Sequence, residues 1–330
     1  MTEESSPGVG IIGCGLVGRK RAQALGTARL VACADPIAER AQALAQASPG
    51  ATSTVEWREV IERRDVDIVV VSTTHDVLAP ITQAALQAGK HVLVEKPAAR
   101  TSAELAEAIN ATRAGRLKAR VGFNHRFHPA LLRAREIAAS GSLGDLMYVR
   151  GRYGHGGRRG YESEWRANPV LSGGGELLDQ GVHLIDLARW FLGDFTEITG
   201  FADTFFWNMP VDDNGFLLLR TPLRQVAFLH ASWTEWKNMF SFEIYGKNGK
   251  LHIEGLGGSY GVERLAYYRM SAEMGPPETT IWEYPGPDTS WSLEFDAFMK
   301  DITLDRYPDP GLHDAVAALR VVESVYASRS

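Results

Sequence analysis

The residues with the clearest chemical meaning are Asp179 and His183, in a segment that reads as a helix. They are four positions apart, so on a helix they share one face. A carboxylate beside an imidazole fixes the orientation of the ring and raises its basicity, which is what a general base requires. Apolar neighbours at Leu178, Val182 and Ile185 favour a buried face. The alternative is a solvent-facing helix with an ordinary stabilising pair.

A lysine follows directly after an apolar run elsewhere in the chain. Residues 91–94 read as a buried strand and lead into Glu95, Lys96 and Pro97. In open α/β sheets ligands bind outside the carboxyl ends of the strands, so Lys96 is expected at the mouth of a ligand crevice. An ammonium there can stabilise a developing alkoxide, and a solvated surface charge is the alternative. Pro97 fixes the direction of the chain beside it.

Residues 13–18 form the pattern G-x-G-x-x-G between a predicted strand and a predicted helix. Gly13 permits a tight turn, Gly15 lets the backbone approach a pyrophosphate, and Gly18 lets the helix pack close to the strand. The N-terminus of the helix offers free N–H groups to phosphate oxygens. In this context the pattern predicts a dinucleotide-binding site.

An acidic residue, Asp35, ends the next predicted strand about 20 positions after the fingerprint, as the motif requires. It is expected to accept hydrogen bonds from the adenosine ribose and to repel a 2′-phosphate, which favours NAD over NADP. Arg40, one turn into the following helix, would partly offset that repulsion. Leu16 and Val17 complete the expected cofactor contacts of this region. The alternative is that Asp35 only caps the helix that follows it.

Short β-branched runs alternate with alanine-rich segments in the first part of the chain. The pattern predicts strands at residues 9–12, 30–34, 68–72, 91–94 and 120–123. It predicts helices at residues 17–26, 37–47, 77–88 and 103–114. This alternation indicates an α/β fold with a doubly wound parallel sheet, and hence a Rossmann domain over residues 1–123.

The pattern changes after residue 123. Helices are expected at residues 129–140, 176–191, 293–302 and 313–328. Strands are expected at residues 146–153, 198–207, 215–220, 225–233, 240–245, 250–253, 263–270 and 279–284. Consecutive strands with short turns favour an open, largely antiparallel sheet, so residues 124–330 are expected to form an α+β substrate and oligomerisation domain. Trp233, Trp236 and Phe240 are expected in this sheet, where they serve packing or an oligomer face.

Composition excludes several classes of function. The chain has 330 residues and a net charge of −5 with well-mixed signs, which predicts no nucleic-acid partner. It has no apolar run long enough to cross a membrane, and its first residues lack the features of a secretory signal. Two cysteines, Cys14 and Cys33, fit a reducing cytoplasm. The spacing of potential ligands predicts no metal site, although His125 and His128 are close.

The fingerprint, the Glu95-Lys96-Pro97 triplet and the glycine-preceded segment with Asp179 and His183 together resemble the Gfo/Idh/MocA family of oxidoreductases. The resemblance spans nearly the whole chain. It implies an N-terminal Rossmann domain, and a C-terminal open sheet through which a homodimer or homotetramer forms. It also implies NAD(P)-dependent oxidation or reduction of a secondary hydroxyl on a sugar, sugar derivative or inositol.

The resemblance also implies roles for individual residues. Lys96 and His183 are the catalytic pair, Asp179 binds the substrate or orients His183, and the bond between Lys96 and Pro97 is expected to be cis. Which of Lys96 and His183 accepts the proton stays open. A proton taken by His183 with Lys96 stabilising the alkoxide is one assignment, and Lys96 as the base is the other.

One segment departs from the family pattern. The family commonly has Thr-Pro-Asn-x-x-His after the fourth strand, where this chain has Thr73, Thr74 and His75, with Leu78 in place of the second histidine. Thr73, Thr74 and His75 are expected near the nicotinamide ribose. His75 is either a cofactor contact or a plain loop residue.

The remaining expected contacts fall into two groups. Those with the cofactor involve Glu95, Lys96 and Asn124. Those with a sugar or cyclitol substrate involve Lys96, Arg126, Tyr153, Trp165, Arg166, Asp179 and His183. The Gly- and Arg-rich segment 153–161 is expected to be a mobile lid or, alternatively, a solvated loop.

Three functions fit these residues. The first is an NAD-dependent dehydrogenase, or a ketosugar reductase in the reverse direction. The second is a glycosidase that keeps NAD bound and uses transient oxidation, which would produce no net NADH. The third is a non-enzymatic sensor that binds NAD as a signal, although a sensor has no need of Lys96, Asp179 and His183.

Overall fold

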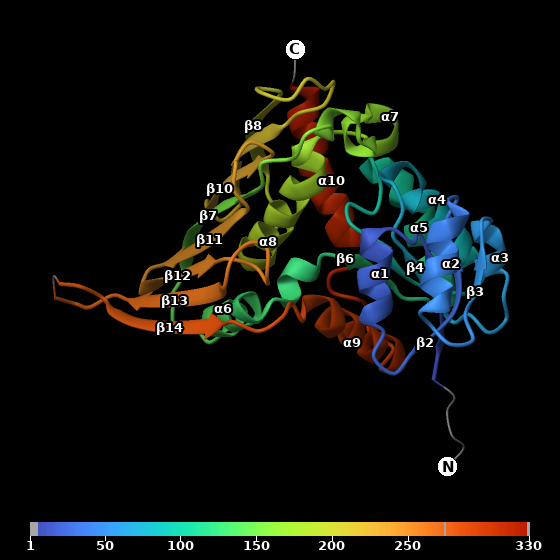
Figure 1. Ribbon diagram of the computed structural model, residues 1–330. Coiled ribbons are helices and arrows are strands. Elements are labelled where there is room, and N and C mark those ends of the chain that lie inside the picture. Colours follow the sequence, from blue (N-terminus) through green and yellow to red (C-terminus); the bar gives the residue numbers. More distant parts are fainter. Residues whose placement is uncertain (1–5, 274, 329–330) are drawn as a thin grey trace. The chain divides into compact units, whose positions relative to one another are not determined.

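Six parallel strands form the sheet of the first compact unit, in the order β3-β2-β1-β4-β5-β6 (Figure 1). The computed structural model describes residues 6–273 and 275–328. The strands are β1 (Gly8–Ile12), β2 (Arg29–Ala34), β3 (Thr52–Thr54), β4 (Ile68–Val71), β5 (His91–Glu95) and β6 (Ala119–Gly122). Every residue of β1 and β4 is buried, as expected for central strands covered on both faces. The strand order is that of a Rossmann fold, which confirms the predicted fold class.

Helices connect these strands. They are α1 (Leu16–Gln23), α2 (Ala38–Gln46), α3 (Trp57–Ile61), α4 (His75–Gln87), the short 3-10 turn η1 (Ser102–Leu105) and α5 (Ala106–Gly115). The sequence did not predict β3 or α3. Strand β3 is a polar edge strand of three residues with no buried position, so it has no apolar pattern to reveal it.

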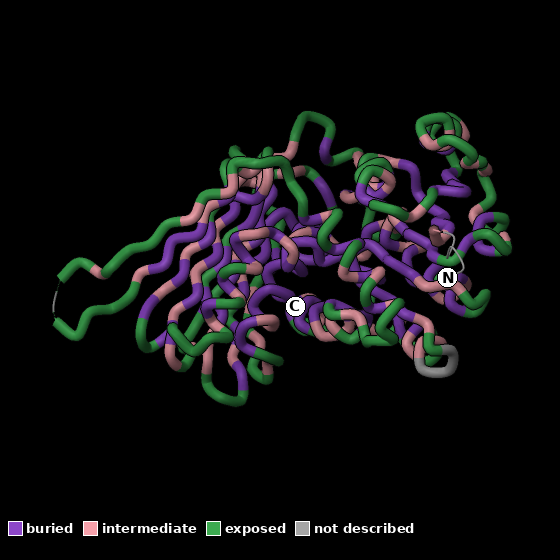
Figure 2. Tube along the Cα trace, turned by 90° about the horizontal axis from the view of Figure 1, so that it is seen from below, coloured by how far each residue is buried: buried purple, intermediate pink, exposed green. Residues whose placement is uncertain are grey.

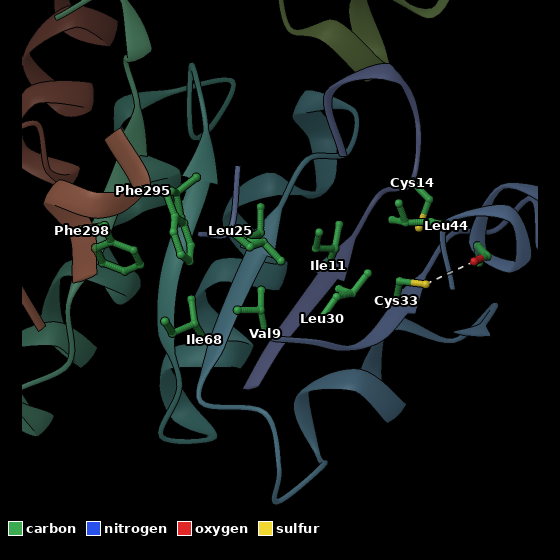
Figure 3. Packing of buried hydrophobic residues seen from close by; sticks show 13 residues of the cluster. Val9, Ile11, Cys14, Leu25, Leu30, Cys33, Leu44, Ile68, Phe295 and Phe298 are labelled. Atoms are coloured by element: carbon green, nitrogen blue, oxygen red, sulfur yellow. Dashed lines mark hydrogen bonds between the residues drawn. The ribbon is translucent and has the colours of Figure 1, made fainter. Parts of the chain in front are cut away.

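The first unit is completed by a helix from the far end of the chain. Helix α9 (Ser290–Thr303) places Phe295 and Phe298 in the same buried cluster as Val9 and Ile68, and Figure 3 shows these side chains together. The first unit therefore comprises residues 1–123 and 291–316. The sequence predicted a division into residues 1–123 and 124–330. The boundary at residue 123 is the same in the structure, but the prediction assigned residues 291–316 to the second domain.

Helix α10 (Leu312–Ala327) begins in the first unit and continues in the second. Residues 1–5, on which the expectation about a secretory signal partly rests, lie outside the described residues. No helix of the described residues is long and apolar enough to cross a membrane.

Eight strands form the sheet of the second unit, in the order β14-β13-β12-β11-β7-β10-β9-β8. They are β7 (Leu146–Gly154), β8 (Glu197–Asp203), β9 (Asn214–Arg220), β10 (Val226–Ser232), β11 (Met239–Gly246), β12 (Gly249–Glu254), β13 (Glu263–Arg269) and β14 (Glu278–Tyr284). Only the pair β7 and β10 is parallel. The sheet is thus open and largely antiparallel, as predicted.

Along the inner strands of this sheet, buried residues alternate with more exposed ones. In β11 the alternation is strict, so one face is covered and the other is accessible (Figure 2). The short elements of this unit are η2 (Asn124–Phe127), η3 (Tyr161–Ser163), η4 (Trp165–Ala167) and α7 (Pro169–Ser172), and the longer helix at the start of the unit is α6 (Pro129–Ala139).

The helix expected at residues 176–191 begins differently. It opens with a π-helical turn, η5 (Leu177–Gly181), and becomes α-helical only in α8 (Val182–Leu192). Asp179 lies in the wide turn and His183 in the regular helix. Such π turns occur often at functional sites.

Candidate functional site

The three fingerprint glycines have different surroundings. A Cβ added to Gly13, which has a φ of +94°, would lie 2.3 Å from the carbonyl oxygen of Ser72. A Cβ added to Gly18 would lie 2.0 Å from the carbonyl oxygen of Gly13. A Cβ added to Gly15 would meet nothing within 4 Å. Gly13 and Gly18 therefore permit close packing within the protein, whereas Gly15 leaves open space beside the start of α1, where a pyrophosphate fits.

This difference predicts opposite outcomes for two substitutions. Gly15→Val is expected to leave the melting temperature unchanged but to weaken NADH binding by about tenfold or more, because its side chain fills the space a pyrophosphate needs. Gly18→Ala is expected to lower the melting temperature, because its methyl group overlaps a backbone oxygen. Thermal melting and NADH titration of both variants check this. Normal NADH affinity in Gly15→Val would contradict the assignment.

Asp35 joins the fingerprint to the start of α2. Its side chain is buried, and its two carboxylate oxygens accept hydrogen bonds from the backbone N–H of Cys14 (2.8 Å) and of Ile37 (2.9 Å). The second bond closes a turn just before α2, whose N-cap is Ile37 and has no side-chain cap, so Asp35 is not the helix cap considered as its alternative. Each carboxylate oxygen has a further lone pair, so these bonds leave acceptor capacity for ribose hydroxyls. Arg40 is exposed on α2, and Leu16 is exposed at the first position of α1.

The segment that departs from the family pattern lies between β4 and α4. Thr74 precedes the first helical residue, and His75 is that residue. His75 is buried, so it is not a plain loop residue. Thr73 and Thr74 are half-buried beside it.

Lys96 follows β5 and is half-buried, and its bond to Pro97 is cis, as the resemblance implied. The neighbouring Glu95 is buried and accepts a hydrogen bond from Nε of Arg21 (2.7 Å). Arg21 also pairs with Glu294 of α9 (2.5 Å). Glu95 thus has a structural partner in the protein, which is enough to account for its burial; a contact with the cofactor stays a prediction.

In the second unit, Asp179 and His183 are both buried. The carboxylate of Asp179 accepts a hydrogen bond from Nε of Arg166 (2.9 Å), so this acid has a cationic partner in addition to its helical neighbour. Burial lowers the pKa of Arg166, but the charges of Asp179 and Tyr161 and the hydrogen bond to Asp179 together outweigh this effect and leave that pKa raised. The predicted residues Asp179 and Arg166 are therefore brought together.

The ring of His183 is stacked on the ring of His125, with 3.7 Å between centroids and 15° between planes. Tyr153 lies edge-on to both rings, at 5.0 Å from His125 and 6.1 Å from His183. Burial raises the pKa of Tyr153 well above its usual value. Sequence reasoning considered His125 only as a metal ligand and missed this stacking. The available signal was its position three residues after the end of β6, since ligands bind outside the carboxyl ends of such strands.

The glycine cluster explains how the start of this helix is held. A Cβ on Gly175 would lie 1.9 Å from the carbonyl oxygen of Asp212. The carboxylate of Asp212 accepts hydrogen bonds from the backbone N–H of Gly175 (3.1 Å) and Leu177 (2.8 Å). The glycines therefore let the backbone approach Asp212, which caps the turn carrying Asp179.

Three other predicted contacts have partners within the second unit. Arg126 was expected to reach a substrate, but it is buried and forms a two-point pair with Asp186 (2.8 and 2.5 Å). Asn124 donates a hydrogen bond to the hydroxyl of Ser290 (2.9 Å). Trp165 is half-buried, and the Arg166 guanidinium lies 4.6 Å from its ring centre. Among the described residues, no group of three or more His, Cys, Asp or Glu side chains could hold a metal ion.

Comparisons with known proteins identify the family. Residues 8–123 match the oxidoreductase family with an NAD-binding Rossmann fold, and residues 131–252 match the Gfo/Idh/MocA C-terminal domain. The chain belongs to the Gfo/Idh/MocA family. Its first unit therefore carries the NAD-binding domain of this family.

Relatives in the Gfo/Idh/MocA family include two curated enzymes. Levoglucosan dehydrogenase of Pseudarthrobacter phenanthrenivorans is 31% identical over 63% of this chain and 56% of its own length. Inositol 2-dehydrogenase 2 of Saccharopolyspora erythraea is 33% identical over 56% of this chain and 53% of its own length. The matches thus span just over half of each relative.

A solved structure of levoglucosan dehydrogenase with NADH has the same fold. Its TM-score is 0.87 at 24% identity, and the superposition covers 98% of this chain and 97% of that one.

Proposed function

We propose that this member of the Gfo/Idh/MocA family is an NAD-dependent dehydrogenase acting on a secondary hydroxyl of a sugar or cyclitol. The open space beside Gly15 at the start of α1 carries the cofactor half of this proposal. Buried His183 and Asp179 support the substrate half, because a potential base lies four residues from an acid that is paired with half-buried Arg166. The names of the curated relatives support a polyhydroxylated substrate.

The chain's own residues then have distinct tasks. His183 accepts the hydroxyl proton, and its stacking on His125 keeps its ring plane fixed. Lys96 donates a hydrogen bond to the developing alkoxide. The ion pair with Arg166 holds the carboxylate of Asp179 in place, and this carboxylate orients the imidazole or a substrate hydroxyl. Bound NAD supplies the carbon that takes the hydride.

The test is a panel of free, phosphorylated and nucleotide-linked sugars and inositols, each offered with NAD and with NADP. Net formation of NADH with a free sugar or inositol is the expected result. Because Asp35 would repel a 2′-phosphate, NAD is expected to be preferred over NADP. Cleavage of a glycoside without net NADH would favour the glycosidase instead. Tight NADH binding with no turnover of any member would favour a sensor.

We further propose that the accessible face of the eight-stranded sheet joins two copies of the chain. Phe201 of β8 is opposite Phe216 of β9, and Leu218 of β9 is opposite Phe228 of β10. Phe201, Leu218 and Phe228 are each more than half exposed, which makes a contiguous apolar patch of the kind that marks protein interfaces. A homodimer or homotetramer would cover it.

Phe228→Arg is therefore expected to dissociate the oligomer while leaving the monomer folded. An arginine within the patch would have to be buried without a partner in the assembly. Light scattering after size exclusion measures the mass, and far-UV circular dichroism checks the fold. An unchanged oligomer, or a monomeric wild type, would show that this face is not the interface.

The cytoplasmic location expected from the two cysteines stays a prediction; both are buried thiols.

A further inference from the structure

Three loops of the second unit are joined by a row of aromatic rings. The loops are residues 155–161, which end at the first residue of η3, 204–213 and 233–238. Tyr161 lies 5.7 Å from Trp207, Trp207 lies 5.2 Å from Phe206, and Phe206 lies 4.6 Å from Trp236, between ring centroids. Trp236 was expected inside the sheet, but it lies in the connection between β10 and β11.

The inner end of the row lies near the proposed site, because Tyr161 packs in the same buried cluster as Ala167, the residue after Arg166. Tyr161 is buried, and the charges of Asp179 and Glu176 add to burial in raising the pKa of its hydroxyl. Arg166, the partner of Asp179, acts on Tyr161 in the opposite direction. The outer end is exposed, since Phe206 is 59% and Trp236 62% accessible. The row therefore leads from the proposed site to the protein surface.

The backbone at the outer end is arranged around these rings. Trp236 has a φ of +56°, a left-handed conformation that bulky side chains rarely adopt. A Cβ on Gly156 would lie 2.9 Å from Cα of Trp236, and one on Gly157 would lie 2.5 Å from the indole of Trp207. A turn alone would be formed more easily by Gly or Asn. The chain thus holds an exposed indole at a strained position, which is typical of residues that contact a ligand.

Two arginines near the row are paired with carboxylates, whereas Arg159 and Lys237 of the same loops are exposed to solvent. Arg158 forms an ion pair with Glu164 (2.6 Å), and Arg152 with Glu235 (3.4 Å). A phosphate would need arginines free to donate two hydrogen bonds, and Arg158 and Arg152 are already engaged by carboxylates. The exposed surface of the row itself is aromatic, and it therefore favours an uncharged occupant that stacks on rings. An uncharged pyranose has an apolar C–H face that packs on an aromatic ring and a rim of hydroxyls that stay hydrated.

We propose that Trp207, Phe206 and Trp236 form a subsite for a second pyranose ring, so that the preferred substrate is a disaccharide or related glycoside. The proposal rests on the proposed function for the position of the first ring. It adds that the second ring stacks on the exposed aromatic side chains.

The test compares Trp236→Gly with a matched control, Arg224→Gly. Arg224 is exposed and has a φ of +67° in the turn between β9 and β10, so both substitutions relieve a left-handed residue. Neither variant is expected to lower the melting temperature. We measure kcat/KM with NAD for cellobiose, maltose and glucose, and disaccharide binding by calorimetry in the presence of NADH. Trp236→Gly is expected to lose about tenfold in kcat/KM and in affinity for the preferred disaccharide, with glucose unchanged. Arg224→Gly is expected to match the wild type.

Other results would contradict the subsite, its uncharged occupant or the proposed function. Equal losses for glucose and the disaccharides, no wild-type binding of either disaccharide, or a loss explained by dissociation of the oligomer would overturn the subsite. Tighter binding of phosphorylated or nucleotide-linked sugars than of neutral disaccharides would overturn the uncharged occupant. Disaccharide binding that depends on Trp236, without oxidation of any sugar, would overturn the proposed function and support the subsite.

Discussion

Lys96→Met is expected to lower kcat by about a thousandfold, because methionine keeps the length of the side chain but cannot donate a hydrogen bond to an alkoxide. The half-buried position of Lys96 accommodates an apolar chain of similar volume, so the fold is expected to be retained. Single-turnover measurement of NADH formation gives the rate. Titration with NADH is expected to show affinity close to that of the wild type.

A companion variant separates the two possible bases. If His183 accepts the proton, His183→Asn loses the acid limb of the pH profile of kcat/KM, whereas Lys96→Met keeps that limb at a lower rate. The opposite pattern would make Lys96 the base. Full turnover by Lys96→Met would remove both assignments, and the NAD-binding sensor would then be the better description.

Arg21→Leu is expected to lower the free energy of unfolding by about 3–5 kcal/mol, because it leaves two buried carboxylates without their cation. Arg21 is buried, contacts Glu95 and Glu294, and lies 4.4 Å from the ring of Trp291. Urea unfolding monitored by fluorescence measures the loss. The control is Arg133→Leu, which removes an exposed pair with Glu136 and is expected to cost about 0.5 kcal/mol or less. Equal effects of the two substitutions would contradict this ranking.

The loss in free energy of unfolding caused by Arg21→Leu is also expected to depend on pH. Burial already raises the pKa of Glu294 above its usual 4.5 in the wild type, and Arg21 opposes that rise. Without Arg21 the pKa of Glu294 rises further, so the folded variant takes up a proton at a pH where the unfolded chain does not. Stability of the variant therefore falls as pH rises from 4.5 through the raised value. The gap to the wild type is expected to be smaller at about pH 5 than at about pH 8.

The sequence predicted the fold where local patterns are strong. The run Ile68–Val71 is apolar at every position, and it became a central strand. The fingerprint glycines are also local signals, and their surroundings show why each is glycine. The return of α9 to the first unit was not predictable from such patterns. It depends on contacts such as Arg21 with Glu294, which join residues far apart in the sequence.

The substrate half of the site was predicted in part. Residue spacing identified Asp179 and His183, because four-residue spacing is visible in the sequence. Spacing could not show that Arg166 pairs with Asp179, that His125 stacks on His183, or that Asp186 takes up Arg126. Each of these partners comes from a different element, so the choice among them is made by tertiary packing. Trp236 was also placed wrongly, in a strand. Strand propensity gives no sign of the left-handed backbone that this residue adopts.

The return of α9 limits how this protein can be divided by engineering. A fragment that stops after Phe123 would lack Phe295, Phe298 and the carboxylate of Glu294, so its hydrophobic core would be open and Arg21 would lose one counter-ion. Exchanging nucleotide domains between relatives by a single crossover at that point would separate α9 from the core it completes. A functional chimera needs two crossovers, with the α9 segment travelling with its own Rossmann sheet.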